Sequence, residues 1–212
     1  MNQPSVTNYL FIRHGAHDYL GRAIAGRLPG VHLNERGRDQ AEHLAAKLSL
    51  LPIDAVYSSP LERARETAEP TAMRANLPLR IAEEFTEIDF GEWTDHAFAD
   101  LSDQPRWQHF NGFRSSTTAP GGELMLEVQT RVLRKLADLR GEHRFVAIFS
   151  HGDVIRATMA HFLGVHLDLF QRIEIDPASL SIVECGDDFT RVRLLNAPWT
   201  GSPLELPSLR HQ

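Results

Sequence analysis

The stretch that decides the fold is Phe145-Val146-Ala147-Ile148-Phe149-Ser150-His151-Gly152. Its first five residues are apolar without interruption, which is typical of a strand buried on both faces of a parallel sheet. Open sheets of this kind bind ligands just beyond the carboxyl ends of their strands. Because His151 and Gly152 stand at that point, the stretch predicts an α/β sheet and a candidate site at its edge.

A second stretch with the same layout lies near the N-terminus. Tyr9-Leu10-Phe11-Ile12 is too short for a helix and rich in strand formers, and Arg13-His14-Gly15 follows it. A single histidine in such a loop is more often an ordinary hydrogen-bonded residue than a functional one. Two histidines in the same setting, one of them preceded by an arginine, indicate a shared site.

The rest of the chain alternates short apolar runs with longer helical stretches, which favours a sheet flanked by helices. The expected fold class is α/β, with a mostly parallel sheet flanked by helices, and residues 1–212 are expected to form a single domain. Further strands are predicted at 55–57, 179–185 and 190–195, and the last two should form a hairpin. Helices are predicted to start after the caps Asn34 and Ser59, and two more should cover 124–139 and 153–163, the latter ending at Gly164.

Between residues 85 and 123 the apolar residues show no clear helix or strand period, and aromatic residues, Gly, Pro and Ser are frequent. A stretch of this length without periodicity is often a lid or a substrate-binding loop, and we expect that role here. Four of its side chains could contact the organic part of a substrate or simply pack the loop onto the sheet: Trp107, His109, Phe110 and Arg114.

Composition limits the partners of the chain. The formal charge of −6 argues against a nucleic-acid or anionic-membrane binder, so positive charge for an anionic substrate must be gathered locally. Cys185 is the single cysteine, which leaves no internal disulfide and no thiolate metal cluster. No signal peptide or membrane span is expected. The prediction is a cytoplasmic protein that acts on a small molecule, with a homodimer left open.

Arg63 adds a third group at the same edge of the sheet. Ser59-Pro60-Leu61-Glu62 follows a predicted strand and resembles a helix start, with serine as the cap and glutamate in a capping box. Arg63 then falls in the first turn of that helix, where its planar fork suits phosphate oxygens. From position alone, an exposed helical arginine is an equally good interpretation.

These residue types together fit phosphoryl transfer to a nitrogen nucleophile. That chemistry needs an unprotonated imidazole, positive charge around three oxygens, and an acid for the leaving alkoxide. His14 can be the nucleophile, and the phosphoryl group can be bound by Arg13, Arg63, His151 and the backbone at Gly152. Glu87 is the preferred acid, although by spacing alone Glu84, Asp89 and Glu92 compete with it.

The ordered set of motifs resembles the histidine phosphatase superfamily, which includes the cofactor-dependent phosphoglycerate mutases. The match runs from about Leu10 to about Leu195. It rests on Arg13-His14-Gly15, Gly26 to Asn34 with Gly37 and Gln40-Ala41, Ser58-Ser59-Pro60-Leu61 with Arg63-Ala64 and Thr67-Ala68, Glu87 with Gly91-Glu92-Trp93, and Ser150-His151-Gly152.

The resemblance implies a phosphohistidine on His14, phosphoryl binding by Arg13, Arg63 and His151, and proton donation by Glu87. It also implies a three-layer α/β sandwich and a reaction without a metal ion, and we expect no cofactor. The chain departs from the family after Gly15, where many members have polar residues and an Asn that contacts phosphate. Ala16-His17-Asp18-Tyr19-Leu20 stands there instead. One phosphate contact of the family is therefore missing or supplied differently, and a phosphatase is favoured over a mutase, which remains the alternative. Thr94-Asp95 and Leu124 also depart from the family, on the substrate side of the expected pocket, so specificity does not carry over.

Three other interpretations have some support in the sequence. Cys185 and Arg191 have the C-x5-R spacing of cysteine phosphatases, but two carboxylates lie between them. His14, His17 and Asp18 could suggest a metal hydrolase, yet no second ligand cluster accompanies them. A non-enzymatic module that binds phosphate ligands on the same fold is the alternative from another class.

Overall fold

The computed structural model describes residues 6–198 and is organised around one six-stranded sheet. Its strand order is β3 (Leu79–Ile81), β2 (Ala55–Ser58), β4 (Phe145–Ser150), β1 (Thr7–Arg13), β5 (Leu180–Cys185) and β6 (Thr190–Ala197). The first four strands run parallel, whereas β5 and β6 form an antiparallel hairpin at one edge. The expected mostly parallel sheet and the C-terminal hairpin are confirmed.

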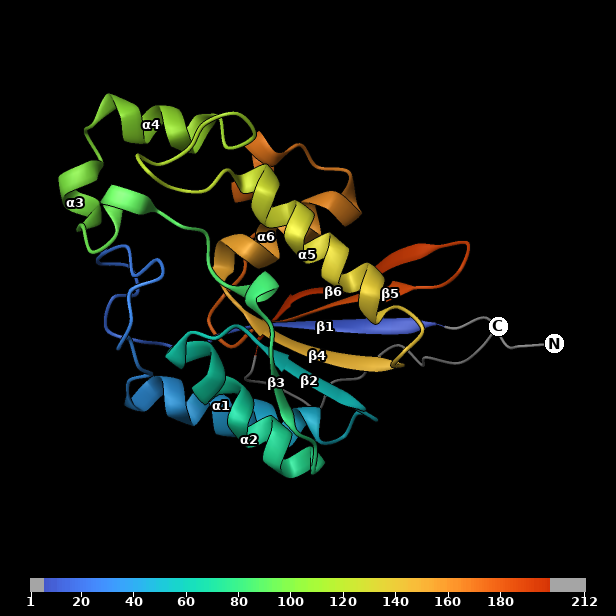
Figure 1. Ribbon diagram of the computed structural model, residues 1–212. Coiled ribbons are helices and arrows are strands. Elements are labelled where there is room, and N and C mark those ends of the chain that lie inside the picture. The colour runs from blue at the N-terminus through green and yellow to red at the C-terminus, as the bar shows by residue number, and fades with distance from the viewer. Residues whose placement is uncertain (1–5, 199–212) are drawn as a thin grey trace.

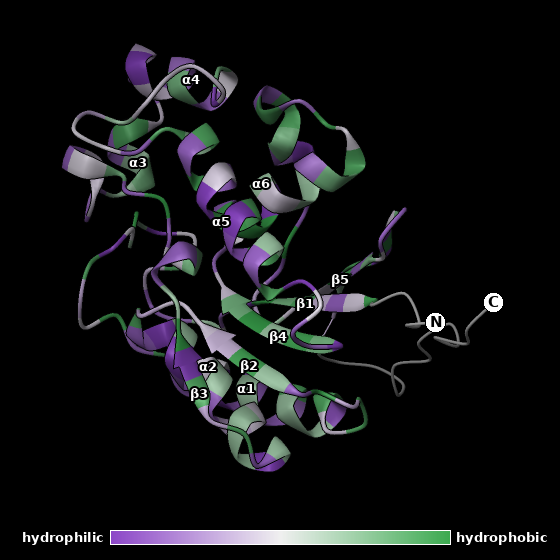
Figure 2. Ribbon diagram, turned by 45° about the vertical axis from the view of Figure 1, so that its right-hand side comes forward, coloured by the Kyte–Doolittle hydropathy of each residue, from purple (hydrophilic) through white to green (hydrophobic). Residues whose placement is uncertain are grey.

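Helices cover both faces of the sheet, as Figure 1 shows. One face carries α1 (Glu35–Leu48) and α2 (Glu62–Ala75), and the other carries α5 (Met125–Leu139) and α6 (Gly152–Leu163). The buried apolar side chains form two clusters, one on each face. In Figure 2 the hydrophobic colour runs through the central strands, while the helices carry both colours. The expected three-layer α/β sandwich is confirmed.

The central strands and the helix ends follow from local sequence. All six residues of β4 are buried, as its uninterrupted apolar run predicts. The Asn34 side chain accepts a hydrogen bond from the Gly37 N–H at 3.0 Å and caps α1. Gly164 ends α6 with a φ of +67°, a left-handed conformation that glycine adopts without strain.

The predicted start of α2 is wrong by two residues. The cap was expected at Ser59, but the helix begins at Glu62 after Leu61, and no side chain caps it. Ser59 lies in the loop before the helix, where its Oγ accepts from the Leu61 N–H at 3.3 Å and lies 2.7 Å from His151 Nε2. Arg63 still falls in the first turn of the helix, so its expected place at the sheet edge is unaffected.

Segment 85–123 is also more ordered than its sequence predicts. It contains η2 (Gly91–Trp93), α3 (Phe98–Leu101) and α4 (Pro105–Gly112), and it follows η1 (Glu83–Phe85). Trp93 packs edge-on against Trp107 and Phe110, with ring centroids 5.2 and 5.1 Å apart. These short helices are held by an aromatic cluster rather than by a repeating apolar stripe, which is why periodicity did not predict them.

The remaining element is η3 (Leu167–Arg172), which packs against α4 and α6. None of the helices within residues 6–198 combines the length and apolar character needed to cross a bilayer.

Candidate active site

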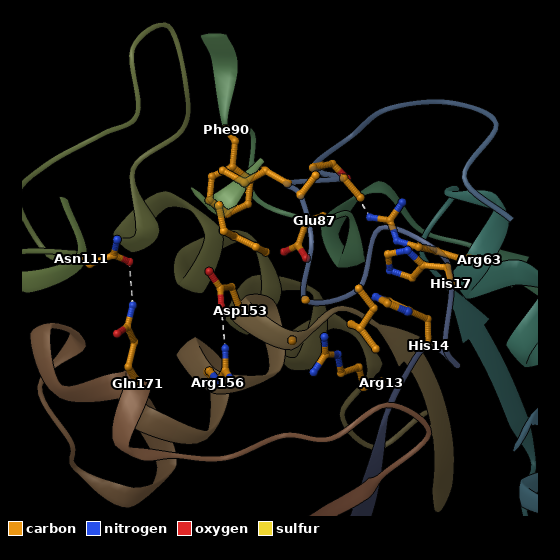
Figure 3. Close-up of a pocket in the computed structure, with 18 of the residues that line it drawn as sticks. Arg13, His14, His17, Arg63, Glu87, Phe90, Asn111, Asp153, Arg156 and Gln171 are labelled. Atoms are coloured by element: carbon orange, nitrogen blue, oxygen red, sulfur yellow. Dashed lines mark hydrogen bonds and ion pairs between the residues drawn. The ribbon is translucent and has the colours of Figure 1, made fainter. Parts of the chain in front are cut away.

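A cavity of about 310 Å³ opens at the carboxyl edge of the parallel strands. Figure 3 shows the labelled side chains that surround it. They come from the end of β1, the loop before α1, the first turn of α2, the segment around Glu87, α4, the start of α6, and η3. The structure therefore brings together groups that are far apart in the sequence, at the edge where parallel sheets bind ligands.

His14 and His151 lie side by side because β1 and β4 are neighbours in register, with Arg13 opposite Ser150. Their rings are 5.2 Å apart between centroids. The Nδ1 atom of His14 lies 2.8 Å from the Gly15 carbonyl oxygen. Since a carbonyl oxygen can only accept, Nδ1 carries the proton and Nε2 keeps its lone pair.

The charge state of His14 suits a nucleophile. Its ring is buried, and burial together with the Arg63 and Arg13 guanidiniums holds the pKa of His14 well below its ordinary value. The imidazole is therefore neutral at neutral pH, with an unprotonated Nε2. This is the form that can attack phosphorus.

Two buried guanidiniums flank His14. Arg13 donates through Nη1 to the Ile175 carbonyl at 2.6 Å, and Arg63 donates through Nη2 to the Gly26 carbonyl at 2.7 Å. Each arginine is thus anchored at one end while its other donors remain available. Arg63 is only 1% exposed, so it is a buried part of the site and not a solvated helix residue.

Several buried donors around His14 have no acceptor within the protein. They are Arg13 Nε, Arg63 Nε and Nη1, His17 Nδ1 and His151 Nδ1. A buried donor without an acceptor costs roughly 1–3 kcal/mol, and more when it is charged, so a set of them requires an explanation. Phosphoryl oxygens would satisfy them, since a phosphoryl group offers several acceptors and negative charge at one point.

His151 is fully buried and lies between Ser59 and Glu87. Ser59 Oγ already accepts a hydrogen bond from the Leu61 N–H, so its own proton can go to His151 Nε2. That leaves the His151 proton on Nδ1, 4.0 Å from Glu87 Oε2. Burial, Arg63 and His14 lower the pKa of His151 well below its ordinary value, so it acts as a neutral donor until an anion arrives.

Of the four candidate acids, Glu87 is the one that lines the cavity, and its side chain is 13% exposed. Burial, together with the nearby Asp153 carboxylate, raises the pKa of Glu87 to about 7. A carboxyl with a pKa near neutrality can give and take a proton at neutral pH, which suits a general acid. The three competing carboxyls, Glu84, Asp89 and Glu92, do not line the cavity.

The two site glycines serve different contacts. A Cβ at Gly15 would lie 2.7 Å from the Gly37 carbonyl oxygen, so this glycine allows the loop to pack on α1. A Cβ at Gly152 would lie 3.3 Å from Arg13 Nε and would crowd the guanidinium. Gly152 thus leaves room for Arg13 in the site.

Three residues that were not assigned to the phosphoryl site line the cavity as well, His17, Asp153 and Arg156. His17 is buried, and its ring lies 4.9 Å from the ring of His14. Asp153 accepts from Arg114 at 3.2 Å and from Arg156 at 3.0 Å, a network partly visible in Figure 3. Asp153 and Arg156 directly follow the His151-Gly152 motif, so adjacency to that motif was the available signal.

For four residues of segment 85–123, the sequence left open whether they contact the substrate or pack the loop onto the sheet. The structure places two of them at the cavity and two away from it. Trp107 and Arg114 line the cavity. Phe110 is buried in the core with the Arg114 guanidinium 3.9 Å above its ring. His109 packs against Phe113 and does not line the cavity.

The cysteine and metal interpretations find no support in the geometry. Cys185 is buried in the β5–β6 hairpin, and burial raises the pKa of its thiol, which is the opposite of what a nucleophile needs. Asp18 accepts a hydrogen bond from Asn34 at 3.1 Å. Within residues 6–198, no group of three or more His, Cys, Asp or Glu side chains is arranged to hold a metal ion.

Comparison with known proteins gives a consistent result. The family model described as the histidine phosphatase superfamily (branch 1) matches residues 9–198. The chain is 31% identical over 185 residues to phosphoserine phosphatase 1 of Hydrogenobacter thermophilus, covering 82% of this chain and 84% of that protein. It is 28% identical over 177 residues to a 2,3-bisphosphoglycerate-dependent phosphoglycerate mutase of Thermoplasma acidophilum, with 82% and 86% covered.

Another relative is longer than the present chain. A bifunctional protein of Mycobacterium tuberculosis is 33% identical over 201 residues, which cover 90% of this chain but only 54% of that protein. Among solved structures, a mycobacterial glucosyl-3-phosphoglycerate phosphatase in complex with VO3 superposes with a TM-score of 0.81 at 27% identity, covering 90% of this chain and 99% of that one.

The sequence match and the structural match thus extend over the same sheet and the same paired histidine loops. With a family model covering nearly all of the described residues and a relative above 30% identity, the chain belongs to the histidine phosphatase superfamily.

Proposed function

We propose that this chain is a cytoplasmic phosphatase that hydrolyses small phosphate monoesters through a phosphohistidine on His14, without a metal ion. The observation that carries the proposal is the unprotonated Nε2 of His14 among buried donors that lack acceptors. Nothing else in the cavity combines a lone pair on nitrogen with so many donors for phosphoryl oxygens.

The first chemical step transfers the phosphoryl group to the enzyme. His14 Nε2 attacks phosphorus while the ester P–O bond breaks, and the Glu87 proton goes to the departing oxygen, which leaves as an alcohol. Arg13, Arg63 and the His151 Nδ1–H stabilise the charge on the three phosphoryl oxygens. Positive charge from two guanidiniums takes the place that a metal ion has in other phosphatases.

The second step returns the enzyme to its starting state. A water molecule attacks the phosphorus of phosphohistidine, and the Glu87 carboxylate accepts its proton. The P–N bond breaks, inorganic phosphate leaves, and His14 is again neutral with its lone pair on Nε2. Glu87 thus gives a proton in one step and takes one in the next, which a pKa of about 7 allows in both directions.

The leaving-group side of the cavity has one apolar wall and one polar wall. The apolar wall includes Ile24, Phe90, Phe98 and Trp107, and the polar wall centres on Asp153. Arg114 and Arg156 both donate to the Asp153 carboxylate, which lowers the positive charge available there to a second phosphate. This favours water over a bisphosphorylated intermediate as the phosphoryl acceptor, and hence a phosphatase over a mutase.

A single incubation separates the candidate functions. We expect the enzyme to release inorganic phosphate from several monoesters in a panel that includes phosphoserine and 3-phosphoglycerate. With 3-phosphoglycerate and a trace of 2,3-bisphosphoglycerate, phosphorus NMR should show free phosphate and not 2-phosphoglycerate. Faster formation of 2-phosphoglycerate would establish the mutase alternative, which the mutase relative keeps open. Phosphate binding without turnover of any ester would indicate a non-enzymatic module.

Metal removal provides a second prediction. Dialysis against EDTA should leave kcat unchanged within about twofold, because the two arginines already supply the electrostatic stabilisation of the transition state. The measurement is phosphate release before and after dialysis, with a Zn²⁺-dependent phosphatase treated in parallel as a control. A loss that Zn²⁺ or Mg²⁺ restores would contradict the proposal and support a metal hydrolase.

A further inference from the structure

A second cluster of charges lies outside the cavity, around the main chain of the segment that carries Glu87. It consists of Arg27, Glu123 and Arg131, and we call it the carbonyl clamp. Arg27 belongs to the loop before α1, Glu123 precedes α5, and Arg131 is on α5. None of the three lines the catalytic cavity, and they instead border a separate surface hollow together with Thr86.

Arg131 donates hydrogen bonds to three main-chain carbonyls of the segment that carries Glu87. Its guanidinium donates through Nη1 to the Glu84 carbonyl, and through Nη2 to the carbonyls of Thr86 at 2.7 Å and Glu87 at 3.4 Å. Its side chain is 19% exposed, so these bonds are partly shielded from solvent. A planar fork of five donors can hold several carbonyls in a fixed arrangement, which a lysine cannot do.

The same carbonyl of Glu87 is held from a second side. Arg27 donates through Nε to the Glu87 carbonyl at 2.8 Å. The Glu123 carboxylate joins the two arginines, accepting from Arg131 Nε at 2.9 Å and from Arg27 Nη2 at 2.7 Å. Glu123 also donates its own N–H to the Asp89 carbonyl at 2.9 Å. The main chain on both sides of the candidate acid is therefore fixed by one network.

The Glu87 carboxyl itself has few direct anchors. Its Oε1 accepts a hydrogen bond from the Ile88 N–H at 3.0 Å, and its Oε2 lies 4.0 Å from His151 Nδ1. A carboxylic acid must lie within hydrogen-bond distance of the leaving oxygen to deliver its proton. Because the carboxyl has few hydrogen-bond partners of its own, the position of the Glu87 main chain decides whether the proton reaches that oxygen.

We propose that Arg27, Glu123 and Arg131 are positioning residues that hold the Glu87 main chain, and so aim the acid at the leaving-group oxygen from outside the cavity. This inference rests on the proposed function, in which Glu87 is the acid. It assigns a catalytic consequence to three residues that contact neither the substrate nor the reacting atoms. A network that merely stabilised the fold would affect all substrates alike.

The test compares leaving groups. Arg131→Met keeps most of the apolar stem and removes the fork, and Arg131→Lys keeps the charge alone. With an alkyl phosphate, kcat should fall on the order of 10- to 100-fold, the cost of a displaced catalytic group. With p-nitrophenyl phosphate, whose leaving group hardly needs a proton, kcat should change less than about threefold by the same argument. KM should be nearly constant for both substrates.

Matched variants complete the experiment. Arg134 is an exposed arginine one turn further along α5, and Arg134→Met should leave both rates unchanged. Adding Arg131→Met to a Glu87→Gln enzyme should cause no further loss with the alkyl phosphate, because the group to be aimed is already inactive. If Arg131→Met does not fold by circular dichroism, Glu123→Gln is the milder variant and should show the same selectivity.

The outcomes separate this inference from the function on which it rests. A selective loss in both Glu87→Gln and Arg131→Met supports both. A second outcome is that Glu87→Gln loses kcat mainly with the alkyl phosphate, whereas Arg131→Met and Glu123→Gln lower kcat equally with both substrates or leave both unchanged. The clamp then only stabilises the fold, and the inference is overturned. If Glu87→Gln is not selective, the acid is misassigned and the inference falls with it.

Discussion

Replacing His14 with Ala should abolish turnover, with a loss on the order of 10⁶-fold, the size seen when an enzyme loses its nucleophile. No other side chain in the cavity has the required lone pair in the required place. His17 is the nearest alternative nitrogen, with its ring 4.9 Å away, and burial together with Arg63 lowers its pKa to about 4. The measurement is kcat with p-nitrophenyl phosphate, whose good leaving group makes residual activity easiest to detect.

The covalent intermediate supplies the control. Wild-type enzyme mixed with a fast substrate and quenched without acid should contain phosphoprotein that is labile to acid and stable to base. His14→Ala should contain none, and His17→Gln, the matched neighbour, should still form it. Phosphoprotein in His14→Ala together with its loss in His17→Gln would move the nucleophile to His17 and contradict the proposal.

The site explains how a chain with a net charge of −6 can bind a dianion. Four arginines line the cavity, Arg13, Arg63, Arg114 and Arg156, against two acidic groups. The pKa of one of those acids, Glu87, is raised to about 7, which reduces its negative charge at neutral pH, and the other, Asp153, keeps its charge. Although burial opposes ionisation of Asp153, Arg114 and Arg156 hold its pKa below the ordinary value. The positive charge expected from composition is therefore local and buried.

Much of this fold could be predicted from the sequence because its signals are local. The buried run of β4, the Asn34 cap of α1 and the Gly164 stop of α6 each depend on a few adjacent residues. The convergence of His14 and His151 also followed, since strands that end in the same way meet at the same edge of a parallel sheet.

The rest depends on contacts between distant residues. Ser59 contacts the ring of His151, 92 residues away, and does not occupy the cap position of α2. The ring contact between Trp93 and Phe110 holds segment 85–123 together, and no apolar stripe with a helical period marks that contact in the sequence. The Arg27–Glu123 ion pair spans 96 residues, and no local pattern predicts it. The residues that aim and tune the site are thus the ones that sequence alone does not reveal.

Replacing Glu87 with Gln should lower kcat roughly 10²- to 10⁴-fold with alkyl phosphates, the usual contribution of a positioned general acid. The amide keeps the shape of the side chain and can still accept the Ile88 N–H, but it has no proton to give. With p-nitrophenyl phosphate the loss should be much smaller, since that phenolate leaves without protonation. Asp89→Asn is the matched control, because Asp89 is a carboxyl of the same segment that does not line the cavity.

The same variant should change the pH profile, and the direction follows from the pKa of Glu87. That pKa is raised to about 7, so the neutral acid predominates below pH 7 and is lost above it. His14 remains unprotonated well into the acidic range because its pKa is lowered. The kcat of the wild type with an alkyl phosphate should therefore fall as pH rises through about 7. This alkaline limb should be absent from Glu87→Gln, and equal losses on both substrates with the limb intact would place the acid on another residue, with Asp89 the first to be tested.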